Sequence, residues 1–237
     1  MALIQYRRLV LLVSVLCMPL VAFAKEDPLN VSLPNMPIPQ GSRVALMGDR
    51  MAINGIPISI IQFSVKADVS QIKQFYISAF KTMGNGVTGE RNLGLDTVLT
   101  YQLGKYYYSA QLHQQNGLSI GKLVVSPTPG SYPEDLSTSL PIPPGGKVAN
   151  KVETLDAGRR SETLTIRCNQ SLETVAEYMK NELLRHEWVE TGIRQSNTKR
   201  DVSTFQLGAS LLQMTISKSN SNGVSGATQL LINWIQN

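Results

Sequence analysis

Side chains suited to metal binding or catalysis are scarce in this 237-residue chain. It has two cysteines and two histidines, and neither type recurs at the short spacing of a zinc site. No His-Glu-x-x-His run and no Gly-x-Ser-x-Gly run is present. The glycine-rich segment 84–89 lacks the lysine of a phosphate-binding loop. We therefore expect no metal, no cofactor and no catalytic residues, and we predict that the protein is not an enzyme.

Clusters of basic residues are also absent. The chain has 22 lysines and arginines and 17 acidic residues, and its net charge of +5 falls to about +3 once Arg7 and Arg8 are removed with an N-terminal leader. Proteins that bind nucleic acid usually carry a concentrated basic patch. The scattered and weakly basic charge therefore predicts that nucleic acid is not a partner.

Long apolar runs are missing from most of the chain, with one exception near the N-terminus. Arg7 and Arg8 precede an apolar run over residues 9–16, and Ala22-Phe23-Ala24 places small residues at a cleavage site. Arginines hold the start of such a run on the cytoplasmic side, and small residues fit the signal peptidase. The run is shorter than the roughly 20 residues that a membrane-spanning helix needs. We predict a signal peptide over residues 1–24 that is cleaved near Ala24.

The leader determines the compartment that we expect. The mature protein is predicted to be periplasmic or secreted, without a transmembrane segment. Cys17 lies in the leader and follows the bulky Leu16, where lipid attachment would need a small residue, so we expect no lipid anchor. Cys168 is then the one remaining cysteine, and a single cysteine cannot form an intramolecular disulfide. Because it continues the apolar positions of an alternating run, we predict a buried structural thiol, with a reactive or intermolecularly paired thiol as the alternative.

The sequence repeats itself after the leader. Met36-Pro-Ile-Pro-Gln-Gly-Ser-Arg-Val44 matches Leu140-Pro-Ile-Pro-Pro-Gly-Gly-Lys-Val148, and Thr100-Tyr-Gln-Leu-Gly104 matches Thr204-Phe-Gln-Leu-Gly208. Matches in the same order and at nearly the same shift are typical of a tandem duplication. The Pro-x-Pro-x-Gly start of each copy is interpreted as a lead into its first strand.

Each copy has the pattern of a sheet with one helix. Alternating apolar residues predict a strand that ends near Val65 in the first copy and near Cys168 in the second. Asp68 and Ser171 follow as helix caps. Apolar residues at helical spacing come next: Val69, Ile72, Tyr76 and Phe80, matched by Leu172, Val175, Met179 and Leu183. Three further strands are expected after each helix.

The predicted fold class is therefore α+β, with two tandem duplicated modules. Each module is expected to be an antiparallel sheet with one packed helix, in the order β-β-α-β-β-β. The predicted divisions are a signal peptide over 1–24, a flexible N-terminal arm over 25–35, module 1 over 36–126, a Pro/Gly/Ser linker over 127–138 and module 2 over 139–237.

Tyrosines provide the candidate binding residues. In the run Tyr106-Tyr107-Tyr108, the first and third side chains share one face of a strand. Tyrosine is favoured at recognition surfaces because it brings a large apolar area and a polar tip. We predict a binding role for Tyr106 and Tyr108, with a packed sheet edge as the alternative, and we expect Trp188 and Trp234 to be core or intermodule residues.

These features favour binding over catalysis. The predicted function is that of an exported, non-catalytic binding or scaffold protein that acts on an envelope or secreted protein through sheet surfaces or edges. One alternative is a carrier of a small apolar molecule or lipid in a cavity between helix and sheet. A less favoured alternative is an envelope hydrolase, although the glutamates at 173, 177 and 182 are expected on a solvated helix face.

Overall fold

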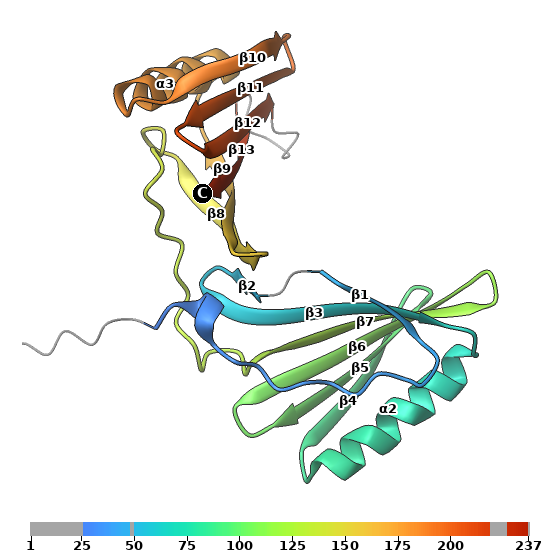
Figure 1. The fold of residues 1–237 in the computed structure, drawn as a ribbon. Coiled ribbons are helices and arrows are strands. Elements are labelled where there is room, and N and C mark those ends of the chain that lie inside the picture. The colour runs from blue at the N-terminus through green and yellow to red at the C-terminus, as the bar shows by residue number, and fades with distance from the viewer. Residues whose placement is uncertain (1–25, 48–49, 219–226, 237) are drawn as a thin grey trace, which may run out of the picture.

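The computed structural model describes residues 26–47, 50–218 and 227–236. The predicted signal peptide, its cleavage site and Cys17 lie outside the described residues. In the described part of the chain, 13 strands form one antiparallel sheet, and two α-helices pack on it (Figure 1). The predicted α+β class, with a mostly antiparallel sheet, is confirmed.

The first half contains seven strands and one α-helix, preceded by a short 3-10 helix. In chain order they are η1 (Pro28–Asn30), β1 (Arg43–Leu46), β2 (Arg50–Ile53), β3 (Ile56–Val65), α2 (Val69–Met83), β4 (Val87–Leu93), β5 (Asp96–Leu103), β6 (Tyr106–Gln115) and β7 (Leu118–Pro127). The strands are ordered β2-β3-β7-β6-β5-β4 across the sheet, and β1 also pairs with β3. Strand β3, which precedes α2, thus pairs with β7, the last strand of this half.

The second half pairs its strands in the same order. Its elements are β8 (Lys147–Asp156), β9 (Arg159–Cys168), α3 (Leu172–Arg185), β10 (Val189–Ser196), β11 (Arg200–Leu207), β12 (Ser210–Lys218) and β13 (Thr228–Gln236). Across the sheet they run β8-β9-β13-β12-β11-β10. Neither α2 nor α3, the helices of the described residues, is long and apolar enough to cross a membrane.

Both helices begin at the predicted caps. The backbone N–H of Asp68 donates to Gln71 Oε1 over 3.1 Å, and the backbone N–H of Thr174 donates to Ser171 Oγ over 3.2 Å. These bonds satisfy polar groups at the start of each helix that have no partner within the helix itself. The helices end at Met83 and Arg185, followed by Gly84 and His186 at the C-cap positions.

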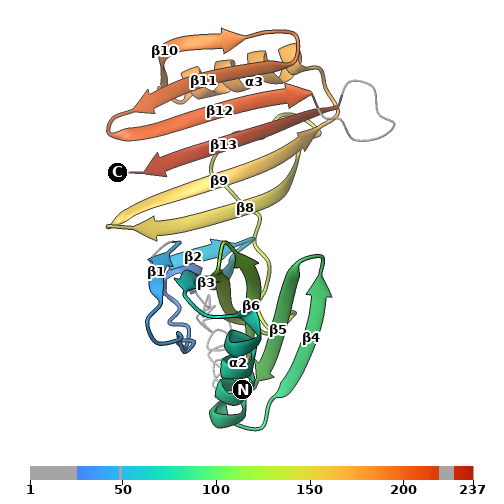
Figure 2. The ribbon, with the colours of Figure 1, turned by 90° about the vertical axis from the view of Figure 1, so that its right-hand side faces the viewer.

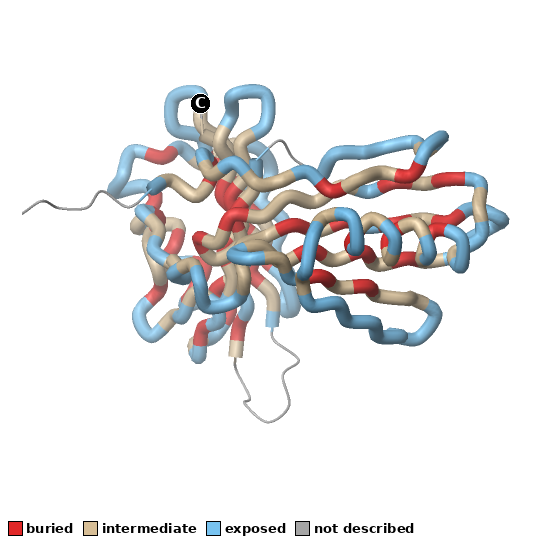
Figure 3. The backbone as a smooth tube through the Cα atoms, turned by 90° about the horizontal axis from the view of Figure 1, so that it is seen from below, coloured by how far each residue is buried: buried red, intermediate tan, exposed pale blue. Residues whose placement is uncertain are grey.

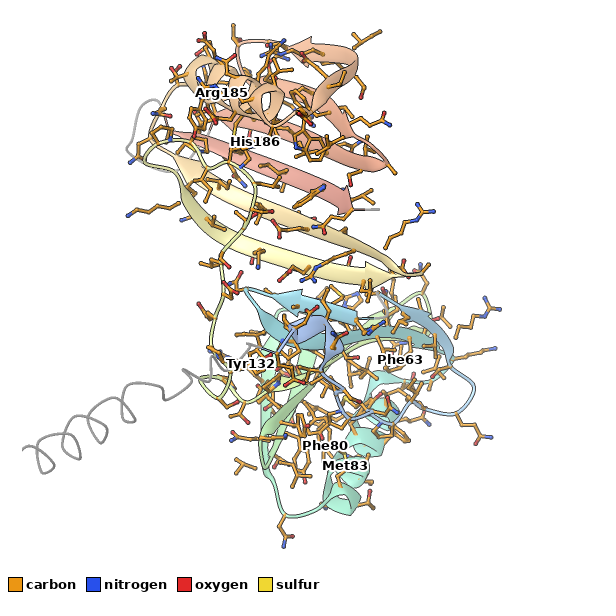
Figure 4. All side chains as sticks on the ribbon, turned by 60° about the vertical axis from the view of Figure 1, so that its left-hand side comes forward. Phe63, Phe80, Met83, Tyr132, Arg185 and His186 are labelled. Carbon is orange, nitrogen blue, oxygen red and sulfur yellow. The ribbon has the colours of Figure 1, made fainter. Side chains whose placement is uncertain are left out.

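Each half has its own core between helix and sheet. The first is rich in aromatic residues, and Figure 4 shows Phe63 on the sheet and Phe80 on α2 within it. A side chain at Gly121 would collide with the ring of Phe63, so the residue paired with Phe63 must be glycine. The second core is mostly aliphatic and includes Cys168, which is 1% exposed. The prediction of a buried cysteine is confirmed, and burial raises the pKa of its thiol.

The tryptophans belong to the second core, as predicted. Trp188 is buried, Trp234 packs against the same cluster, and their rings meet edge to face with centroids 6.2 Å apart. Such a contact adds to the apolar area that the two rings bury. Buried residues follow the strands and helices of both halves in Figure 3, whereas the connecting turns are exposed.

Four strands follow each helix, where the sequence predicted three. The missed strands are β4 and β10, which directly follow α2 and α3. All seven residues of β4 are exposed, and β10 has no buried residue. A strand with no buried face needs no alternation of apolar and polar residues, so the pattern that revealed the other strands is absent here.

The two halves are joined edge to edge. Strand β2 pairs with β3 on one side and with β8 on the other, which makes the sheet continuous (Figure 2). Asn54, in the turn after β2, extends this junction: its N–H donates to the carbonyl of Lys151 over 2.7 Å, and its Oδ1 accepts from the Lys151 N–H over 2.9 Å.

The segment predicted as a flexible arm packs at this junction. Leu29 is 1% exposed, and η1 contacts β2, β3 and β8. Arg160 of β9 forms an ion pair with Asp27, and Arg50 of β2 donates to Asn30 Oδ1. The arm is held because Leu29 is buried where η1 contacts strands of both halves, while Asp27 binds Arg160 of the second half and Asn30 binds Arg50 of the first.

Candidate functional site

The outermost strands of the sheet are β4 and β10. They lie at opposite ends of the strand order, so each pairs with a neighbour on one side only. Figure 2 shows β10 at the top of the molecule and β4 along the right-hand side of the first half. An edge strand presents backbone donors and acceptors to which another chain can pair. These two strands, and the short strand β1, which pairs with β3 alone, are therefore the places where a partner can extend the described sheet.

Strand β4 is the more regular of the two edges. Its seven residues pair with β5 without a register shift, from Val87 opposite Gln102 to Leu93 opposite Asp96. Val87 is 74% exposed, and Leu95, in the turn after the strand, is 88% exposed. The strand contains neither proline nor lysine, two residues that commonly protect edges from pairing. It is an open edge with apolar residues at both ends.

Strand β10 is interrupted by a bulge. Its pairing with β11 shifts register between Thr191 and Gln195. Gly192 lies inside this stretch with φ of 76°, which side chains with a Cβ rarely adopt. Beyond it, the Arg194 guanidinium forks onto the buried carboxylate of Asp201, with bonds of 2.8 and 3.0 Å to Oδ2. Bulges bend and twist an edge, so β10 is a poorer template for an added strand.

Each edge strand is tied to its helix by one ion pair. Lys73 of α2 lies 2.6 Å from Glu90 of β4, and Lys180 of α3 lies 2.6 Å from Glu190 of β10. Glu90 therefore points to the face of the sheet that α2 covers. Because side chains alternate along a strand, Arg91 and its neighbours at 87, 89 and 93 point to the opposite face.

The predicted binding tyrosines lie on the helix-covered face of β6. Tyr108 is 3% exposed and its ring lies 5.9 Å from that of Tyr101, inside the first core. Tyr106 is half-buried against the same core, and the Lys105 ammonium lies 5.4 Å from its ring centroid. This placement removes Tyr108 from the expected binding surface, since α2 and the neighbouring strands cover that face. The packed alternative describes these residues better.

A charged cluster lies where the arm and the linker meet the second half. Lys151 and Glu153 of β8 and Glu162 of β9 are all nearly inaccessible. Lys151 Nζ lies 3.1 Å from Glu153 Oε2, and Arg160 donates to Glu153 Oε1 over 2.7 Å. Thr138 of the linker donates to Glu162 Oε1 over 2.5 Å, and Lys151 donates to the Ser137 carbonyl over 2.9 Å.

This junction cluster borders an open cleft of about 520 Å³. Burial raises the pKa of Glu162, whereas both oxygens of Glu153 are held by cations. A carboxyl group with a raised pKa beside a second carboxyl group that is paired with cations is an arrangement that hydrolases use. Here, however, Glu162 and Lys151 also bind Thr138 and Ser137 of the linker, and Arg160 binds Asp27 of the arm, so the contacts hold these segments against β8 and β9.

A histidine–carboxylate pair lies on the face of the first half opposite α2. His113 Nδ1 is 2.8 Å from Asp96 Oδ1, and Gln111 donates to Asp96 Oδ2 over 2.5 Å. These bonds, that from Gln111 foremost, lower the pKa of Asp96. No spacing in the sequence indicates this pair, because Asp96 and His113 are brought together only by the β5–β6 hairpin.

Comparison with known proteins returns no matching family model, no matching curated protein and no matching solved structure. The geometry of the chain is therefore the basis for any functional conclusion. Of the features found, the edge strands and the junction cluster were missed by sequence reasoning. The glutamates of the cluster alternate along β8 and β9 as polar residues, and nothing in their spacing indicates burial.

Proposed function

We propose that this is an exported, non-catalytic binding or scaffold protein whose sheet edges bind another protein of the envelope or the extracellular space. The observation that carries the proposal is the pair of exposed terminal strands, β4 and β10, on one continuous sheet. The chain already uses this mode of contact internally, since β2 of the first half adds to the edge of β8. A partner would extend the sheet in the same way at a free edge.

The proposal includes the duplication. The repeated sequence segments are supported by the shared strand order, in which β3-β7-β6-β5-β4 corresponds to β9-β13-β12-β11-β10. The helix follows the corresponding strand in both halves, and a lysine–glutamate pair ties it to the edge strand in each. Two copies joined through β2 and β8 present the regular edge of β4 and the bulged edge of β10 on one sheet, which suits a scaffold.

Export to the periplasm or the medium remains part of the proposal and rests on the leader sequence. Arg7 and Arg8, the apolar run and the small residues near Ala24 support it. The absence of nucleic-acid binding is proposed from the scattered charge.

The carrier alternative is less well supported by the packing. Both helix–sheet interfaces are filled by buried side chains, including the stacked rings of Phe80 and Tyr101, whose centroids are 4.8 Å apart. An apolar groove of about 620 Å³ lies beside α2, bordered by Phe75 and Met83, but it is open to solvent. A carrier for an apolar molecule needs a site that buries most of its ligand.

Site-specific photo-crosslinking in intact cells tests the proposal. A photoreactive residue replaces Leu93 at the end of β4, Ile193 on β10, or Leu184 on α3. All three side chains are exposed. We expect a defined protein partner to be captured from Leu93 or Ile193 and not from Leu184. Capture from Leu184 alone, or no protein captured from any position, would contradict binding through the edges.

A further inference from the structure

Strand β4 is open to a partner but poorly suited to a second copy of itself. Two β4 strands can pair antiparallel through the same edge only around an axis normal to the sheet, which keeps both helices on one face. Full overlap of the seven residues then places Val87 opposite Leu93 and Glu90 opposite Glu90. Like charges that face each other directly destabilise a strand pair. The edge is thus protected from self-pairing at its centre while remaining regular along its length.

The face of β4 away from α2 presents side chains that an added strand would contact. Along it lie Val87, Gly89, Arg91 and Leu93, a row with apolar ends and one positive charge. The cross-strand neighbour of Arg91 on β5 is Val98, and the one carboxylate of β5, Asp96, lies opposite Leu93 and is already bonded to Gln111 and His113. By contrast, Glu90 on the helix side is already paired with Lys73 at 2.6 Å. Arg91 is therefore the charged residue of β4 with which a residue of an added strand can form an ion pair.

We infer that β4 binds an extended segment of another exported protein, antiparallel, with an acidic residue opposite Arg91 and apolar residues opposite Val87 and Leu93. The antiparallel direction follows the pairing of every strand in the described sheet. On the partner segment, an apolar residue is followed two positions later by the acid, and a second apolar residue comes four positions after that. This inference rests on the proposed function and specifies the edge and the chemistry of the partner.

A charge-swap binding experiment tests the inference with the mature protein. The probe is a fluorescent peptide, Ser-Val-Thr-Glu-Thr-Thr-Thr-Val-Ser, whose counterpart has lysine in place of glutamate. Fluorescence anisotropy should show the glutamate peptide binding the wild type about fivefold to tenfold more tightly than the lysine peptide, since an opposite-charge pair replaces a like-charge pair. Arg91→Glu should reverse this preference.

Arg43→Glu is the matched control because it makes the same charge change on another exposed edge strand, β1. It should leave the preference for the glutamate peptide intact. An equal loss of preference in Arg43→Glu and Arg91→Glu would assign the effect to net charge and overturn the inference. Failure of both peptides to bind the wild type at millimolar concentration would overturn it as well.

Two further outcomes separate this inference from the proposed function. If crosslinking at Ile193 captures a partner while Arg91→Glu alters neither that capture nor peptide binding, the edge-binding function holds and the β4 inference fails. If sedimentation shows the wild type dimerising, and Glu90→Gln strengthens the dimer while Arg43→Glu does not, β4 pairs with its own copy and the heterotypic inference is overturned.

Discussion

The two halves of this protein build the same strand order around different cores. In the first half, Phe63, Tyr76, Phe80, Tyr101 and Tyr108 form a chain of ring contacts between α2 and the sheet. In the second half, the corresponding space is filled mainly by leucine, isoleucine, valine and methionine. What the halves share is the position of the apolar residues, not their chemistry. The periodic pattern selects the fold, and side chains of suitable total volume then fill it.

The halves also differ at their free edges. Strand β4 is regular and exposed along its whole length, whereas β10 is bulged near Gly192 and ties Arg194 to Asp201. Both edges are nevertheless anchored to a helix by a lysine–glutamate pair of the same length. Edges at corresponding places in the strand order can thus be left regular in one half and interrupted in the other by a single change of register.

Large-to-small substitutions in the two cores test whether the halves are equally dependent on packing. Phe80→Ala should reduce the free energy of unfolding by about 3–5 kcal/mol, and its counterpart Leu183→Ala by about 2–5 kcal/mol. Both residues are at most 2% exposed, so each change leaves a cavity. Urea denaturation followed by circular dichroism measures both. Changes in the free energy of unfolding near zero for both variants would mean that the cores collapse around the cavities.

Removal of a buried charge should distinguish the second half from the first. Glu153→Ala removes the carboxylate of β8 that pairs with the buried Lys151. It should reduce the free energy of unfolding by about 3 kcal/mol. The exposed counterpart is Glu90→Ala, which breaks the ion pair with Lys73 and should cost less than about 1 kcal/mol. The same denaturation experiment compares them. A cost at Glu153 no greater than that at Glu90 would show that the junction cluster is solvated.

The junction should also make stability depend on pH through Glu162. Burial raises its pKa in the folded protein above the ordinary 4.5, so the folded state binds the proton more tightly than the unfolded state does. The stabilising effect of protonation is present below pH 4.5 and is lost as the pH rises through the raised pKa. Glu162→Gln keeps a neutral group at every pH. Its melting temperature relative to wild type should therefore increase from pH 4 to pH 8; an unchanged difference would contradict the burial effect.

Apart from the Glu90 control, the smallest expected effect is at the bulge of β10. Gly192 has φ of 76° and open space around the position of a Cβ, so Gly192→Ala introduces backbone strain without a collision. We expect a loss of about 1 kcal/mol, measured by thermal unfolding. Gly89→Ser at the matched position of β4 is the comparison: Gly89 is not at positive φ, and its cost would come from contact with Thr100. A neutral Gly192→Ala would show that the bulge is free to rearrange.

Sequence reasoning was most successful where burial leaves a periodic pattern. The strand ends near Val65 and Cys168, the caps at Asp68 and Ser171 and the apolar helix stripes all lie where they were predicted. It failed for β4 and β10, which bury too little to carry a pattern. It also failed for Tyr108, because alternation shows which residues share a face but not which face a helix covers.

The amino-acid sequence by itself determined the class of fold, the positions of the two helices and the burial of Cys168. These follow from local preferences, namely capping, helical spacing and strand alternation, which act between residues close in the chain. The tertiary structure alone decided that β2 joins β8, that the arm docks at the junction and that Glu153 is buried. Those features depend on contacts such as that between Asn54 and Lys151, which are far apart in sequence and meet only once both halves have folded.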